Sequence, residues 1–210
     1  MNLLDQISAS IQARMVRPWV LKNYEKTPYG KRIAQLRNKH SGQRCFIVAN
    51  GPSLRPEDLD LLQQRGEITF GMNRIYKLFD QTRWRPTYYV CEDELIAQSQ
   101  QPEINAIEAE AKFIPIELKW WHGVEIADAV YFHLNYKEEE RYPCSFSTDI
   151  AHQLDCRGTV TFSCMQLAAY MGFSEIYLLG VDHNYRVTID INGNVITDTT
   201  QKDYFCEGYD

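Results

Sequence analysis

The chain has 210 residues, of which 44% are hydrophobic and 24% are charged. This length is enough for one domain with a full core, and the composition excludes collagen-like, coiled-coil and disordered proteins. No apolar run approaches the roughly 20 residues of a membrane-spanning helix, and the first residues lack the basic start and apolar centre of a signal peptide. We therefore expect a cytoplasmic protein.

The six cysteines predict reduced thiols. Cys45, Cys91 and Cys164 lie within apolar segments, and no pair of cysteines has the spacing of a zinc site. We therefore expect neither a disulfide framework nor a structural metal.

The first 45 residues are basic, with nine Lys and Arg residues against two acids, whereas the rest is acidic and brings the net charge to −6. Apolar residues at helical spacing predict a helical extension over residues 1–43, which breaks at Arg17-Pro18 and resumes from Tyr29 to Asn38. Residues 1–26 could rest on the anionic surface of the inner membrane, or the extension could pack on the domain or on a second copy of the chain, which is the commoner role. Nucleic acid is not an expected partner, because the body is acidic.

From residue 44 onward, short apolar runs alternate with helical stretches, which is typical of an α/β protein with a wound, mostly parallel sheet. We predict strands at 44–49, 67–71, 87–91, 112–116, 129–132 and 175–180. We predict helices at 56–64, 74–79, 93–110 and 160–171, and the last of these should be buried because it is apolar on nearly every face. A C-terminal β-hairpin is expected around Asn192-Gly193. Residues 44–210 are expected to form a single domain.

Polar residues follow four of the predicted strands. In open α/β sheets, ligands bind beyond the carboxyl ends of the strands, so these residues are the candidate site. They are Asn50, Gly51, Pro52, Ser53, Asn73, Arg74, Glu92, Asp93, Gly180, Asp182, His183 and Asn184.

The loop after the first strand has the clearest interpretation. Gly51 would let a ligand approach the backbone, Pro52 stiffens the loop, and Asn50 and Ser53 offer hydrogen bonds to a phosphate or ribose. The spacing matches neither a P-loop nor the glycine pattern of dinucleotide-binding domains, which disfavours a P-loop kinase and a standard NAD site. A plain strand-to-helix connection is an equal alternative.

The other strand ends also have two interpretations each. Asn73 could bind a base or a sugar hydroxyl, or it could cap the next helix. Glu92 and Asp93 could bind a metal or act as a base, or they could form a solvated first helical turn. Asp182 could tune His183 for proton transfer near neutral pH, although a lone histidine is usually structural.

Three further segments could contact a ligand. Residues 158–161 precede the buried helix and could bind an anion through free amides and hydroxyls. The aromatic run 120–122 could stack on a sugar ring or pack in the core. Residues 133–158 are long for a connection and predict a lid over the site, whose candidate contacts are Tyr136, Arg141, Tyr142 and His152.

Four segments together resemble a bacterial family. They are RCFIVANGPSL, ITFGMNRIY, WRPTYYVCED and GTVTFSCMQLAAYMGFSEIYLLGVDHNY, which span roughly residues 44–186. The chain resembles the sialyltransferases of glycosyltransferase family 42 and the broader 6-hydroxymethylpterin diphosphokinase-like family, which includes motility-accessory, flagellin-modifying glycosyltransferases. The resemblance implies a Rossmann-like domain, with helices on both faces of the sheet, that binds a nucleotide-activated donor such as CMP-sialic acid.

The resemblance also implies roles for individual residues. Asn50 and Gly51 would contact the nucleotide phosphate and ribose, and Asn73 would contact the cytidine or the donor sugar. Thr159 and Val160 lie where these enzymes place Ser-Gly amides on the donor, and the missing Ser-Gly pair leaves the CMP specificity open. Asp182 to Tyr185, including Asn184, would complete the nucleotide pocket.

The general base of the sialyltransferases is a histidine after the final strand and hairpin, and no histidine follows His183 here. Either the chain continues beyond residue 210, or His183 takes this role, or this copy is inactive.

The leading hypothesis is a metal-independent glycosyltransferase that moves a sugar from a nucleotide-sugar donor to a glycan or protein acceptor, in surface-glycan or flagellin glycosylation. His183 and Asp182 would be catalytic, and Arg74 or Arg157 would stabilise the leaving phosphate. An ATP-dependent pterin diphosphokinase is the alternative, with Mg²⁺ on Glu92, Asp93 and Asp182. The third hypothesis is a nucleotide-binding module without catalysis.

Overall fold

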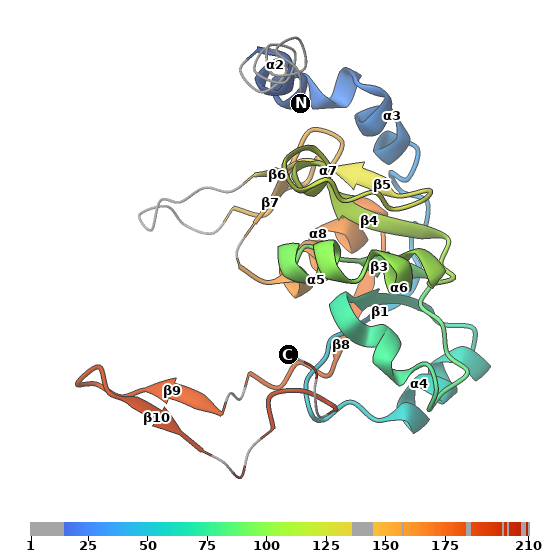
Figure 1. Ribbon diagram of the computed structural model, residues 1–210. Helices are drawn as coiled ribbons and strands as arrows, with labels where there is room; N and C mark the ends of the chain where they lie inside the picture. The colour runs from blue at the N-terminus through green and yellow to red at the C-terminus, as the bar shows by residue number, and fades with distance from the viewer. Residues whose placement is uncertain are drawn as a thin grey trace.

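The computed structural model describes residues 15–135, 145–156, 158–183, 186–198, 200, 202–206 and 209. Its centre is a six-stranded parallel sheet in the order β5-β4-β3-β2-β1-β8 (Figure 1). The strands are β1 (Arg44–Val48), β2 (Ile68–Met72), β3 (Tyr88–Val90), β4 (Ala111–Pro115), β5 (Val130–Phe132) and β8 (Glu175–Leu179). All six predicted strands are confirmed, with their ends shifted by no more than one residue.

Helices cover both faces of this sheet, as predicted, with α5 and α6 on one face and α8 behind it (Figure 1). They are α4 (Pro56–Gln64), the 3₁₀ helix η3 (Asn73–Leu78), α5 (Glu94–Ser99), α6 (Gln101–Ala106), α7 (Ile116–His122) and α8 (Val160–Tyr170). Helix α8 is largely buried, which confirms the prediction from its apolar faces. None of the described helices is long and apolar enough to cross a membrane.

The prediction of one helix over residues 93–110 was wrong. The structure has two short helices, α5 and α6, which meet at Gln100, whose backbone is not helical (φ −121°, ψ 29°). Pro102 lies in the first turn of α6, where a missing N–H is harmless. Within a continuous helix its ring would meet the carbonyl of Gln98, so the proline divides the segment.

The N-terminal residues that the structure describes pack on the β5 side of the domain. They form α2 (Arg17–Lys22), the 3₁₀ helix η2 (Tyr24–Lys26) and α3 (Pro28–Ala34). Tyr24 and Ile33 are fully buried, and the Tyr24 hydroxyl donates to the Tyr131 carbonyl at 2.8 Å. Pro18 lies in the first turn of α2, and Met15 and Val16 directly before α2 are π-helical, so the helical winding changes at Arg17-Pro18, where we expected the helix to end or bend. The apolar pattern before Met15 lies outside the described residues.

A second, separate sheet confirms the predicted hairpin. Strands β9 (Val187–Ile189) and β10 (Val195–Thr197) pair antiparallel, and the hairpin projects from the body of the domain (Figure 1). Gly193 has a φ of 83°, a backbone conformation that favours glycine in such a turn. Two short strands, β6 (Leu134–Asn135) and β7 (Leu154–Asp155), form a small parallel pair.

Three cysteines are buried, as their apolar surroundings in the sequence predict. Cys45, Cys91 and Cys164 are buried and free. Burial raises the pKa of both Cys45 and Cys91 to about 12, so these thiols stay protonated at neutral pH.

A polar network closes the amino end of the sheet, opposite the candidate site. The Tyr88 hydroxyl lies 2.6 Å from Nε2 of His40 and 3.1 Å from the carboxylate of Glu110, and it accepts from Lys39 at 2.9 Å. Nδ1 of His40 lies 2.7 Å from the side-chain oxygen of Gln43. The one proton of the Tyr88 hydroxyl is donated to Glu110 or to Nε2 of His40, according to the tautomer of His40, and in both cases the hydroxyl joins three segments of the chain.

Candidate functional site

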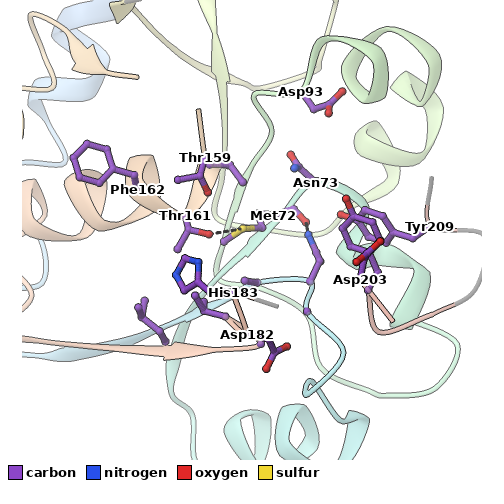
Figure 2. A pocket seen from close by; sticks show the side chains of 18 of the residues that line it. Met72, Asn73, Asp93, Thr159, Thr161, Phe162, Asp182, His183, Asp203 and Tyr209 are labelled. Atoms are coloured by element: carbon purple, nitrogen blue, oxygen red, sulfur yellow. Dashed lines mark hydrogen bonds between the residues drawn. The ribbon is translucent and has the colours of Figure 1, made fainter. Parts of the chain in front are cut away.

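A cavity of about 300 Å³ opens at the carboxyl ends of β1, β2, β3 and β8, beside the first turn of α8. Its volume is at the lower end of the range for small-molecule sites. Among the residues that line it are many of those predicted from the strand ends, namely Asn50, Gly51, Asn73, Asp93, Thr159, Val160, Gly180, Asp182 and His183 (Figure 2). Residues distant in sequence therefore meet at one rim, as expected for an open α/β sheet.

Gly51 has a structural role in addition to the one that we predicted. Its N–H donates to the Gly180 carbonyl at 2.9 Å, so the loops after β1 and β8 cross in direct backbone contact. A Cβ at residue 51 would lie 2.5 Å from the Gly180 oxygen and would overlap the carboxylate of Asp182. The glycine is thus needed because two loops approach each other, and the approach of a ligand is not required to explain it.

Asp182 does not orient His183 in the way that the sequence suggested. Oδ2 of Asp182 accepts from the backbone N–H of Ser53 at 3.0 Å, which ties the two loops together a second time. His183 has a positive φ of 50°, and its imidazole points toward Thr161, whereas the Asp182 carboxylate lies on the other side of the chain (Figure 2). His183 is exposed at the rim, in a position to contact a bound substrate.

Asn50 offers a hydrogen-bond acceptor to the cavity. The residue is only 8% exposed, and its Nδ2 donates to the Met72 carbonyl at 3.2 Å. Because that contact fixes the orientation of the amide, Oδ1 is the atom left over, and Oδ1 is buried with no partner in the part of the chain that the structure describes. A ligand hydroxyl or amino group would satisfy it, whereas a phosphate oxygen would not.

Asn73 adds a second unsatisfied acceptor at the end of β2. Its backbone is left-handed, with a φ of 47°, and the Tyr89 hydroxyl donates to its carbonyl at 2.6 Å. Its Oδ1 is buried and has no partner among the described residues, and its side chain does not cap η3. A strained asparagine with an unsatisfied amide is typical of a binding position.

Glu92 and Asp93 face different surroundings. Asp93 lines the cavity and caps α5, because its Oδ1 accepts from the Ile96 N–H at 2.9 Å. Glu92 is not among the lining residues. Its Oε1 is buried without a partner in the described structure, and burial raises the pKa of this carboxyl to about 7. Glu92 is therefore largely neutral below neutral pH.

The first turn of α8 forms the opposite wall of the cavity. Thr159, Val160 and Thr161 line it, and the Thr159 side chain does not cap the helix. The first turn holds no acidic residue, so the positive end of the helix dipole and its free amides face the cavity. This wall suits an anion such as a phosphate.

Arg74 does not reach the cavity, so the prediction that it stabilises a leaving phosphate finds no support in its position. Its Nη1 donates to the carbonyl of Tyr209, and its guanidinium lies 5.9 Å from the centre of the Tyr209 ring. Pro52 and Ser53 also lie outside the lining, and the lining holds no lysine or arginine among the described residues.

Sequence reasoning missed the residues near the end of the chain. Asp203, Tyr204 and Tyr209 line the cavity although they follow the hairpin. The one signal that could have found them is the density of aromatic residues after residue 203 in an otherwise polar stretch.

Other predicted contacts lie elsewhere. Trp120, Trp121 and His122 belong to α7 and are not in the lining, so they are not a stacking wall for this cavity. His152 lies 3.2 Å from the carboxylate of Glu25, on the N-terminal side of the domain. Several predicted residues lie outside the described part of the chain: Tyr136, Arg141, Tyr142, Arg157, Asn184 and Tyr185.

Comparisons with known proteins place the chain in a family. No curated protein matches it. Among solved structures it is similar to the MAf glycosyltransferase from Magnetospirillum magneticum AMB-1, with 18% identity and a TM-score of 0.48, over 77% of this chain and 28% of that one. The chain thus spans less than a third of that protein. A family model described as 6-hydroxymethylpterin diphosphokinase MptE-like matches residues 19–188, more than half of the chain, and the chain therefore belongs to the MptE-like family.

Proposed function

We propose that the chain is a glycosyltransferase that uses a nucleotide-sugar donor, with a CMP-sugar as the donor and a bacterial surface glycan or flagellin as the acceptor. The observation that carries the proposal is that the cavity offers hydrogen-bond acceptors on one side and hydrogen-bond donors on the other. Asn50 and Asn73 present unsatisfied acceptors on the sheet side, and the uncapped end of α8 presents amide donors on the other. A nucleotide-sugar has hydroxyls for the first wall and phosphate for the second.

The chemistry follows from these positions. His183 at the rim would accept the proton of an acceptor hydroxyl as its oxygen attacks the anomeric carbon. The bond from that carbon to the phosphate oxygen breaks, and the nucleotide leaves with the electron pair. The first turn of α8 would stabilise the negative charge on the leaving phosphate, a task for which no basic side chain is available in the described lining.

Binding and turnover test the two parts of this proposal separately. Asn50→Ala should weaken the binding of CMP by roughly 5- to 150-fold in calorimetry, the range expected when a buried acceptor loses its partner. Asn192→Ala, at the exposed tip of the hairpin, is the matched control and should bind CMP as the wild type does. Unchanged affinity in Asn50→Ala would rule out this placement of the ligand.

His183→Gln should keep CMP affinity but lose at least 100-fold in the acceptor-dependent release of CMP from CMP-sialic acid, if the imidazole is the base. Near-normal turnover in this variant would remove His183 from the mechanism. Normal binding with no turnover in the wild type would favour a nucleotide-binding module without catalysis.

A second candidate, an ATP-dependent pterin diphosphokinase, is favoured by the three aspartates in the lining, Asp93, Asp182 and Asp203. Among the described residues no three His, Cys, Asp or Glu side chains gather closely enough to hold a metal, and Oδ2 of Asp182 already accepts from Ser53. A magnesium ion here would take most of its ligands from the phosphates of ATP and from water. A thermal shift with ATP that requires magnesium, and none with CMP, would favour this candidate.

A further inference from the structure

The residues after the hairpin return to the cavity and are fastened to the site. We call Lys202–Cys206 and Tyr209 the C-terminal segment. The backbone N–H of Phe205 donates to the Asn50 carbonyl at 3.1 Å, so this segment is tied to the loop after β1. Tyr204 and Tyr209 both line the cavity, and Tyr209 lies across from Thr159 and Thr161 (Figure 2).

Three aromatic side chains of this segment pack on one another. The rings of Tyr204 and Tyr209 are stacked, with centroids 3.9 Å apart and planes at 14°. Phe205 meets Tyr209 edge to face at 5.7 Å, and Tyr209 is only 6% exposed. Burial raises the pKa of Tyr209 well above its ordinary value, so its hydroxyl is neutral at physiological pH. Within this stack Tyr209 is buried, and the half-buried Tyr204 presents the aromatic surface that a ligand in the cavity can reach.

Arg74 holds this aromatic surface in a fixed position through its contacts with Tyr209. Its Nη1 donates to the Tyr209 carbonyl, its backbone N–H donates to the Tyr209 hydroxyl at 3.4 Å, and its guanidinium lies over the Tyr209 ring. These contacts attach the aromatic surface to the beginning of η3, next to Asn73, which lines the same cavity.

We infer that Tyr204, supported from behind by Tyr209, forms the wall on which the planar base of the nucleotide stacks, and that Arg74 is a positioning residue for this wall. The inference rests on the proposed function, because it needs a nucleotide in the cavity. Stacking of a base on an aromatic side chain is tolerant of base identity, since every base has a π-face. The wall would thus favour ligands with an aromatic ring over the same ligands without one, and other contacts would choose among bases.

The test compares ligands with and without a base by calorimetry. The probes are CMP, UMP and ribose 5-phosphate, measured against the wild type, Tyr204→Ala and Tyr204→Phe. Tyr204→Ala should bind both nucleotides about 10-fold or more weakly and ribose 5-phosphate unchanged, whereas Tyr204→Phe should bind all three as the wild type does. Trp121→Ala, which removes an exposed aromatic side chain outside the cavity, is the matched control.

The positioning role of Arg74 has its own readout, the ratio of CMP affinity to ribose 5-phosphate affinity. Arg74→Gln should lower this ratio as Tyr204→Ala does, and circular dichroism confirms that the variant is folded. If Tyr204→Ala keeps its nucleotide affinity, or loses affinity for all three probes equally, the aromatic wall is overturned while nucleotide binding stands. If the wild type binds neither nucleotide, the proposed function and this inference fall together.

Discussion

Replacing Glu92 by glutamine is expected to stabilise the protein above neutral pH. Oε1 of this carboxyl is buried without a partner among the described residues, and burial raises its pKa from 4.5 to about 7. In the unfolded chain the carboxyl ionises near its ordinary pKa, so between these two values unfolding releases a proton that the folded protein keeps. The contribution of this group to the free energy of unfolding is therefore most favourable at acidic pH, falls as the pH rises from 4.5, and is lowest above pH 7.

The size of the effect follows from the two pKa values. One pKa unit corresponds to about 1.4 kcal/mol, so the rise from 4.5 to about 7 represents roughly 3 kcal/mol. Glutamine has nearly the same shape and is neutral at every pH. Glu92→Gln should therefore gain up to roughly 3 kcal/mol over the wild type at pH 8 and almost nothing at pH 4.5.

Urea denaturation followed by tryptophan fluorescence measures this difference, because Trp84 is buried in the core and reports on unfolding. The measurement is made at several values from pH 5 to pH 8 for the wild type and for Glu92→Gln. Glu108→Gln, which changes an exposed carboxyl, is the control and should follow the wild type at each pH. A constant difference between the wild type and Glu92→Gln across this range would refute the argument, because a neutral side chain would then be no better at high pH than at low pH.

Two further substitutions test other parts of the structure. Gly51→Ala should lower the free energy of unfolding by about 1–3 kcal/mol, because the new methyl group would overlap the carboxylate of Asp182. If urea denaturation gives this variant the stability of the wild type, the two loops do not cross as described. Tyr88→Phe should lower the free energy of unfolding by roughly 1–3 kcal/mol, because it removes the hydroxyl shared by His40 and Lys39 at the amino end of the sheet. If the free energy of unfolding is unchanged in the same assay, water replaces the hydroxyl without loss of stability.

The sequence predicted the sheet well because each central strand is a short apolar run between polar segments. Strand β4, buried at all five positions, is an example. The sequence also predicted which edge of the sheet carries the site, because the carboxyl ends of parallel strands lie at the same edge. Pro102 was visible in the sequence, but its effect on the predicted helix over 93–110 was underestimated.

The finer geometry of the site could not be predicted, because it depends on contacts between distant segments. Nothing near Gly51 in the sequence shows that Gly180 lies against it. The amide of Asn50 is oriented by the carbonyl of Met72, a residue in the next strand. Tyr204 and Tyr209 reach the cavity only because the chain turns back after the hairpin, a path that no local pattern specifies.

The two edges of the central sheet differ in how they are protected. At the β5 edge, the N-terminal segment occupies backbone acceptors, because Tyr24 donates to the Tyr131 carbonyl and Arg32 donates to the carbonyl of Ala129. At the other edge, β8 pairs only with β1 among the described strands, and the side chain of Leu178 is 45% exposed. An unpaired edge is a template for adding a strand. A further strand should therefore pair with β8, because the N-terminal segment covers the β5 edge of the sheet.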